Sequence, residues 1–230
     1  MQCLRWSRSW IFLPRIVLRQ DFGKSGVLLP SLPSSSRTHN QEYRADRFRT
    51  SLQFRTLPYG NFYMALDACK VADYVVFVLS TNVEVDNWGE TLLRTLQAQG
   101  LPEVVTVIAP NPSLDPKIRS GIHKSLLSFV QFFVPTQTRV YDLDIASDRL
   151  NAIRALSEGK PADVRWRGNR SWILGESTEW SDGTLKVTGV VRGVPLCVNR
   201  LVHIPNFGDY QISQVKPFVL NSVIVYRNYP

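Results

Sequence analysis

The sequence has few of the residues that build metal sites and disulfide frameworks. All three cysteines and all three histidines lie far apart along the chain: Cys3, Cys69, Cys197, His39, His123 and His203. No local spacing among them matches a zinc ligand set, and three scattered cysteines do not make a disulfide framework. We therefore expect no metal site, and we expect the protein to work in a reducing compartment.

Long hydrophobic runs are also absent. The best apolar stretch, Val71 to Leu79, contains Asp73 and is far shorter than the roughly 20 residues that span a bilayer. Hydrophobic residues make up 44% of the 230 residues and charged residues 20%, which is typical of globular proteins. We expect one large domain or two small ones, and no membrane partner.

Acidic residues are scarce near the N-terminus. Residues 1–60 contain ten Lys and Arg against three Asp and Glu, a net charge of +7, while the rest holds 17 basic and 16 acidic residues. Residues 1–50 are therefore interpreted as a basic, atypical and poorly ordered segment, with a nucleic-acid-binding arm as the alternative. The four arginines and no acid in residues 1–20 also resemble a mitochondrial presequence, which leaves a mitochondrial location open.

After a loop-like segment at 30–40, strands and helices alternate. Apolar stretches predict strands at 51–56, 74–79, 104–109 and 139–142, and helical spacing predicts helices beginning near 62, 87, 116 and 147. Asp115 followed by Pro116 is a strong helix start. Strand–helix repeats with short connections predict right-handed crossovers and a parallel sheet, so residues 51–160 are expected to form an α/β domain of the nucleotide-binding kind.

The pattern changes after Pro161. Apolar and polar residues alternate from 170 to 215, with Gly, Pro and Asn at the breaks. Several short strands at this spacing indicate a small β-barrel or sandwich. The boundary is expected near 158–168, with the second domain covering 161–230.

Most groups that would hold a nucleotide are missing. A phosphate loop needs G-x-x-x-x-G-K-[ST], but Leu18 stands where the first glycine should precede Gly23, Lys24 and Ser25. The metal-holding D-x-x-G aligns with residues 56–60, which lack the Asp. The guanine-reading N-K-x-D would begin at Asn111, where the Lys is absent and Asp115 comes one position late. Phosphoryl transfer depends on such placed charges.

No other catalytic set replaces these groups. We expect Asp142 and Asp144 to point to opposite faces of a strand, and we interpret His203 as a satisfied histidine of the β-domain rather than a general base. We therefore predict no catalytic residues and no cofactor. GTP with magnesium belongs to the alternative hypothesis, in which Gly23, Lys24 and Ser25 hold phosphate.

Three stretches carry a family resemblance: ALDACKVADYVVFVLS (65–80), VRWRGNRSWIL (164–174) and LKVTGVVRGVPLCVNRLVHIPNFGDYQISQV (185–215). Across roughly residues 50–216 they resemble the eukaryotic pre-rRNA-processing family of GTPase-like small-subunit assembly factors. That family comprises the twenty-S-rRNA-accumulation protein and a larger GTP-binding relative. The resemblance implies a degenerate P-loop-GTPase-like parallel sheet, followed by a translation-factor-like β-barrel.

The same resemblance implies a role in maturing the small (40S) ribosomal subunit by binding pre-ribosomes rather than by catalysis. Implied partners are the pre-40S particle, rRNA, ribosomal proteins and U3 snoRNA-containing complexes, and the implied location is the nucleus and nucleolus. An active assembly GTPase of the same superfamily is the alternative. Because residues 215–230 leave the family pattern, a truncated chain with an incomplete barrel, and a fragment without function, are further hypotheses.

Arginines are the candidate RNA contacts. Arg165, Arg167 and Arg170 surround Trp166 and Trp172, and guanidinium groups and indole faces both suit nucleic acid. Two more candidates, Arg192 and Arg200, lie beside predicted turns. The competing interpretation places the tryptophans in a core and leaves the arginines solvated or bracing the β-domain.

Overall fold

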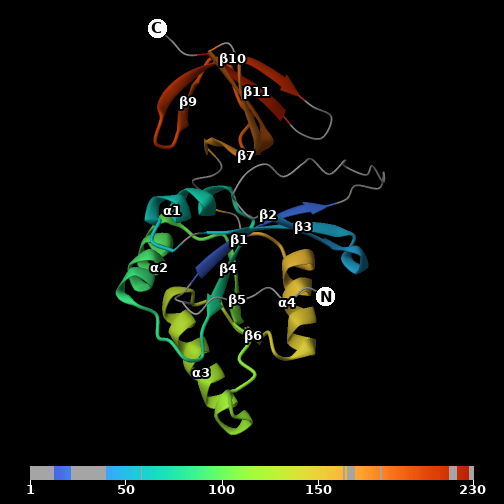
Figure 1. Cartoon of the computed structure of the whole chain (residues 1–230), viewed down its shortest axis with the longest axis vertical. Coiled ribbons are helices and arrows are strands. Elements are labelled where there is room, and N and C mark those ends of the chain that lie inside the picture. The colour runs from blue at the N-terminus through green and yellow to red at the C-terminus, as the bar shows by residue number, and fades with distance from the viewer. Residues whose placement is uncertain are drawn as a thin grey trace. The chain divides into compact units, whose positions relative to one another are not determined.

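The structure is a computed structural model that describes residues 13–21, 40–57, 59–162, 164, 169–181, 183–217 and 222–227 (Figure 1). Within these ranges, the side chains of residues 13–21, 40, 41, 217 and 222–227 are not described. The chain divides into two compact units, residues 1–163 and 164–230. Among the described residues, no helix is both long and apolar enough to cross a membrane.

The first unit is a sheet with helices on both faces. Its strands are β1 (Leu13–Asp21), β2 (Asn40–Ala45), β3 (Thr50–Thr56), β4 (Tyr74–Leu79), β5 (Glu103–Ile108) and β6 (Val140–Asp142). Its helices are α1 (Phe62–Val71), α2 (Asn87–Gln99), α3 (Pro116–Phe133) and α4 (Ala146–Glu158), with a short 3-10 helix η1 (Asp46–Phe48). The predicted strands and helices between 50 and 158 are confirmed to within one residue at most of their ends.

The sheet is mixed, and the prediction of a parallel sheet is confirmed only in part. Its strand order is β2-β3-β1-β4-β5-β6. Strands β4, β5 and β6 are parallel, whereas β1 is antiparallel to both β3 and β4, and β2 is antiparallel to β3. Helical crossovers fix the direction of β4, β5 and β6, whereas β1 lies before the predicted domain of residues 51–160 and is joined to the sheet without such a crossover.

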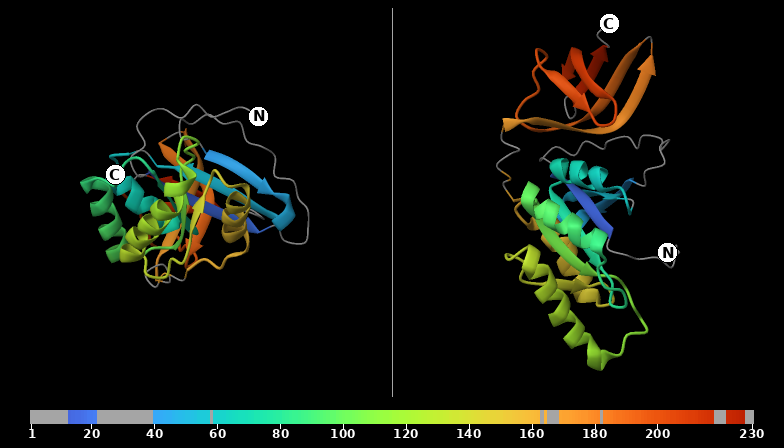
Figure 2. Two further views of the ribbon diagram at one scale, coloured as in Figure 1. Left: turned by 90° about the horizontal axis from the view of Figure 1, so that it is seen from below. Right: turned by 90° about the vertical axis from the view of Figure 1, so that its left-hand side faces the viewer.

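The two faces of the sheet are covered unequally. Helices α1, α2 and α3 lie on one face and α4 on the other (Figures 1 and 2). The first face forms the larger core, in which Phe77 and Leu79 pack with Leu92 and Leu96. Strand β4 is buried along its whole length because helices cover both of its faces.

The second unit is a five-stranded antiparallel sheet with the order β7-β8-β11-β10-β9. Its strands are β7 (Ser171–Ser181), β8 (Thr184–Gly193), β9 (Leu201–Ile204), β10 (Gly208–Pro217) and β11 (Ser222–Arg227). Ile212 is buried at the centre of its core, against Ile173, Val187 and Val202. Among the described strands no pairing joins the edge strands β7 and β9, so the predicted barrel stays a prediction.

Candidate functional site

The carboxyl ends of β4, β5 and β6 meet at one edge of the sheet, where ligands bind in parallel α/β folds. Three loops follow these strands: residues 80–86, 109–115 and 143–145. This edge is the candidate site, because a nucleotide base and its metal would be held by groups on such loops. We call it the carboxyl edge.

Asn111 ties the three loops of the carboxyl edge together. Its backbone N–H donates to Asp144 Oδ2 at 2.9 Å. Its side-chain Nδ2 donates to Thr81 Oγ1 at 2.7 Å and to Asn82 Oδ1 at 3.0 Å. The amide that would read a base edge in an N-K-x-D motif is therefore already hydrogen-bonded within the protein.

A charged cluster lies beside Asn111. Arg119 donates to Asp142 Oδ2 at 2.5 Å and to Asp144 Oδ2 at 3.3 Å, and His123 Nε2 lies 3.1 Å from Asp142 Oδ2. Burial alone would raise the pKa of the Asp142 carboxyl. Hydrogen bonds from the Asp144 N–H, His123 and Arg119 outweigh that effect, so the pKa of Asp142 lies below its ordinary value. Contact with Asp142 in turn raises the pKa of Arg119.

The expectation that Asp142 and Asp144 point apart is wrong. Side chains alternate along a strand with a period of two, so residues two apart share a face. Here β6 ends at Asp142, and the Asp144 N–H donates to Asp142 Oδ1 at 2.8 Å. Both carboxylates form ion pairs with Arg119.

Sequence reasoning missed three residues of this cluster: Arg119, His123 and Asp148. Arg119 and His123 are four residues apart on α3 and therefore share a face, a spacing that pointed to a common partner. Asp148, which is 7% exposed, accepts from the Asp142 N–H at 3.1 Å and from Arg139 at 2.6 Å. It fixes the first turn of α4 to the end of β6.

The motif positions have structural roles. Asp115 caps α3 by accepting from the Lys117 N–H at 2.9 Å, which confirms the predicted cap. At the position of the absent D-x-x-G, Tyr59 donates to Asp86 Oδ2, and Asp86 also caps α2 through the Gly89 N–H at 2.9 Å. Asp115 and Asp86 therefore cap α3 and α2, and Tyr59 joins its turn to Asp86.

Gly23, Lys24 and Ser25 lie outside the described residues. The strand before them, β1, is described, and its direction does not fit a phosphate loop. Val17 pairs with Tyr74, the first residue of β4, and Leu13 pairs with Val78. The carboxyl end of β1 is therefore at the opposite edge of the sheet from the carboxyl ends of β4, β5 and β6.

The predicted arginines do not form one cluster. Arg165 and Arg167, with Trp166, lie outside the described residues. Arg192 pairs in register with the half-buried Trp172, and the carbonyl of the exposed Arg170 accepts from the Val194 N–H at 3.3 Å, so these two arginines share one end of the β7–β8 pair.

Arg200 lies at the other end of the second sheet. It precedes Leu201, which pairs with Gln211 of β10. Gln211 also pairs with Arg227 of β11, and Arg227 pairs with Thr184, the first residue of β8. Arg192 is near the last residue of that strand. Only Arg170 and Arg192 are therefore brought together among the described candidates.

The His203 ring has a hydrogen-bond partner, as interpreted, but its side chain lies on the surface of the β-domain rather than in its core. Its side chain is 66% exposed, and Nδ1 lies 2.8 Å from Asp209 Oδ1 across the β9–β10 pair. Alternation along β9 turns Val202 and Ile204 toward the core and His203 outward. Within the described part of the chain, no group of three or more His, Cys, Asp or Glu side chains is arranged to hold a metal ion.

Comparison with known proteins gives the family. Residues 30–158 match the family model described as Tsr1, G-like domain, and residues 160–219 match the AARP2CN (NUC121) domain. A ribosome biogenesis protein tsr1 from Schizosaccharomyces pombe is 44% identical over 171 residues, which cover 74% of this chain and 22% of that protein. The human pre-rRNA-processing protein TSR1 homolog is 30% identical over 225 residues, covering 93% of this chain and 28% of that protein.

The solved structures add the fold. The bacterial selenocysteine-specific elongation factor EF-Sec aligns with a TM-score of 0.55 at 13% identity, covering 84% of this chain and 35% of that one. That likeness shows an architecture shared with a translation factor. The family model spans more than half of the chain, and the chain belongs to the Tsr1 family of pre-rRNA-processing proteins.

Proposed function

We propose that this chain is a ribosome biogenesis factor for maturation of the small (40S) ribosomal subunit, and that it acts by binding pre-ribosomal particles without hydrolysing GTP. Relatives in the family are named as ribosome biogenesis and pre-rRNA-processing proteins. The chain spans about a fifth to a quarter of their length, 22% of the Schizosaccharomyces pombe protein, so the role is carried over from longer proteins.

The observation that supports binding without catalysis is the self-contained carboxyl edge. At the position where a base would be contacted, the Asn111 N–H donates to Asp144. Asp142 and Asp144 both accept hydrogen bonds from Arg119. A nucleotide would have to displace these bonds, and breaking a hydrogen bond to a charged group costs about 1.5–3 kcal/mol. The degenerate sheet then serves as a docking body.

The proposed partners are the pre-40S particle, its rRNA and ribosomal proteins, including U3 snoRNA-containing complexes, in the nucleus and nucleolus. Arg170 and Arg192, with Arg165 and Arg167 close in sequence, are the proposed phosphate contacts of the second unit. We propose further that this unit belongs to a translation-factor-like β-barrel. Such a barrel would bind the surface of the small subunit that translation factors occupy.

Titration with a fluorescent GTP analogue in the presence of magnesium tests the nucleotide half of the proposal. We expect no saturable binding, and no change for Lys24→Ala. Micromolar, magnesium-dependent binding that Lys24→Ala abolishes would overturn the proposal in favour of an active assembly GTPase.

Sucrose-gradient sedimentation of nuclear extract tests the ribosomal half. We expect the tagged chain to travel with pre-small-subunit particles, and Arg170→Glu with Arg192→Glu to move it toward the top of the gradient. Arg154→Glu, which reverses an exposed arginine on α4, is the control and should sediment as the wild type does. A wild-type chain that stays at the top would instead identify a fragment without function.

A further inference from the structure

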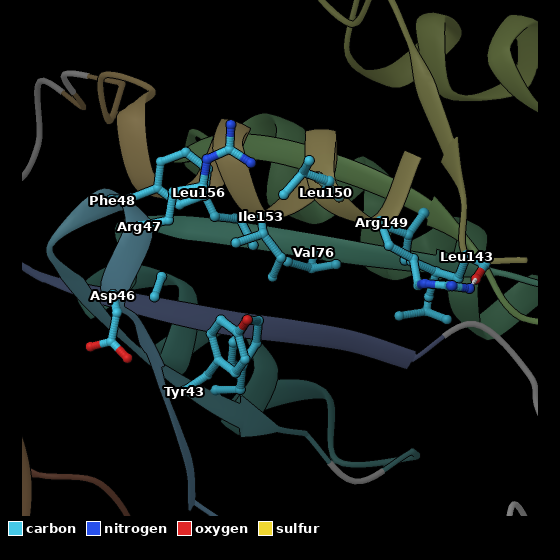
Figure 3. Close-up of a pocket in the computed structure, with 15 residues that line it drawn as sticks. Tyr43, Asp46, Arg47, Phe48, Val76, Leu143, Arg149, Leu150, Ile153 and Leu156 are labelled. Atoms are coloured by element: carbon cyan, nitrogen blue, oxygen red, sulfur yellow. Dashed lines mark hydrogen bonds between the residues drawn. The ribbon is translucent and has the colours of Figure 1, made fainter. Parts of the chain in front are cut away.

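Among the residues that the structure describes, α4 is the one α-helix on its face of the first sheet. A cavity of about 540 Å³ opens between α4, the β2–η1 corner and strands β3, β4 and β5 (Figure 3). We call it the α4 groove. Three helices cover the opposite face of the same sheet. The sheet residues that line the groove are themselves largely buried: Val76 and Val107 are each 5% exposed and Val78 is 9% exposed.

Apolar side chains line the α4 groove on three sides. Phe54, Val76, Val78 and Val107 come from the sheet, Phe48 from η1, and Leu150, Ala152, Ile153 and Leu156 from α4. Leu150 is 40% exposed and Tyr43, at the β2 side, is 49% exposed. The accessible apolar side chains therefore lie at the rim of the groove, and apolar side chains bordered by charged ones occur at protein-interaction sites.

The charges at the groove border are positive. Arg47 and Arg149 lie toward opposite ends of the groove in Figure 3. Arg149 donates to the carbonyls of Leu143 at 2.7 Å and Asp144 at 3.3 Å, and Arg47 lies 6.0 Å from the Phe48 ring centroid. Among the described residues neither arginine pairs with a carboxylate. The acid at the border, Asp46, is neutralised by Arg44 at 2.7 Å.

The length of the groove matches a helix. From Arg149 to Leu156 the α4 axis rises about 10 Å, or about two turns. A neighbouring helix of that length places apolar residues at i, i+3, i+4 and i+7 on one face. With basic residues at both ends of the groove, the complementary helix carries acidic residues at both ends.

We propose that the α4 groove docks an amphipathic helix of a protein partner, with an apolar stripe of about two turns flanked by Asp or Glu. The chain's own remaining segments do not have this composition. Residues 1–12 contain Arg5 and Arg8 and no acid, and residues 22–39 contain Lys24, Arg37 and two prolines and no acid. Either would bring like charge to Arg47 and Arg149.

The test uses two synthetic peptides with one leucine stripe, one flanked by Glu at both ends and one by Lys. Fluorescence polarisation against the full chain should show the Glu-flanked peptide binding roughly tenfold more tightly, as two exposed ion pairs provide. Leu150→Asp should abolish this binding. Arg47→Glu combined with Arg149→Gln, which keeps a donor for the Leu143 carbonyl, should remove the preference between the peptides.

Arg154→Glu is the matched control, because Arg154 lies on the same helix, pairs with Glu158 at 3.8 Å and does not line the groove. Hydrogen exchange should show peptide-dependent protection at α4 and residues 43–48. Equal affinity for both peptides, or protection at other elements, would overturn the proposal. Self-association lost in Leu150→Asp would assign the groove to a second copy, and displacement of the peptide by an RNA oligonucleotide would assign it to nucleic acid.

Discussion

At the residue scale, Asp142 is the side chain on which the carboxyl edge depends. It is 1% exposed and receives hydrogen bonds from Arg119, the Asp144 N–H and His123. Asp142→Asn should lower the free energy of unfolding by about 2 kcal/mol, below the usual range for a broken buried ion pair because Arg119 keeps contact with solvent. Asp144→Asn should cost less than about 1 kcal/mol, since its ion pair is longer and more exposed. Urea unfolding of both variants measures the difference; equal losses would contradict it.

Acid should weaken the same contact. The pKa of folded Asp142 lies below the ordinary value of 3.8, so the unfolded chain takes up its proton first as the pH falls. The stabilisation is therefore fully present above about pH 5 and is lost progressively as the pH drops below about 4. Urea midpoints for wild type and Asp142→Asn should differ most near neutral pH and converge toward pH 3. A gap that stays constant down to pH 3 would show that Asp142 carries no such coupling.

Single residues also show where sequence reasoning succeeds and fails. The cap at Asp115 was predictable because an N-cap depends on neighbours in sequence alone. The bonds of Asn111 to Thr81 and Asp144 join residues about thirty positions apart, and no local pattern records them. The error at Asp142 and Asp144 has a simpler cause, because the strand period itself places them on one face.

At the element scale, helix ends are the most predictable features. Asp86 and Asp115 both cap helices, but Asp86 also accepts from the Tyr59 hydroxyl, a bond that raises the pKa of Tyr59. Asp115→Ala should cost about 1 kcal/mol, and Asp86→Ala up to about 2 kcal/mol because it loses two contacts. Thermal unfolding compares the two, with Asp86→Asn as a variant that keeps an acceptor. A larger loss for Asp115 would contradict the assignment.

The direction of β1 marks the limit of prediction for elements. The strands β4 and β5 were predictable with their direction, because an apolar run joined to a capped helix implies a parallel crossover. Strand β1 precedes the predicted domain, and its antiparallel pairing with β3 and β4 depends on which neighbouring strands have free edges. The pairing of β1 is therefore determined by the whole sheet rather than by residues 13–21 alone.

At the scale of the whole molecule, the second unit was predictable as a set of strands but not as a closed shape. Alternation along β8 and β9 tells which side chains face the core. Closure depends instead on whether β7 and β9 find partners. The register of β10, with its irregularity between Ile212 and Gln214, is likewise a property of the assembled sheet.

The two units should also differ in stability, because they bury very different cores. In the described residues of the first unit, Leu92, Leu93 and Leu96 are among many fully buried side chains. Among the side chains described in the second unit, the buried apolar ones are Val164, Leu174 and Ile212. Guanidinium unfolding should therefore show two transitions, with the second unit unfolding first. Ile212→Ala should lower the first transition alone and Leu96→Ala the second alone, each by about 2–4 kcal/mol. Tryptophan fluorescence and circular dichroism can follow both, since β-strands dominate the second unit and helices occur in the first. One coincident transition that both variants shift equally would mean that the units unfold as a single cooperative body.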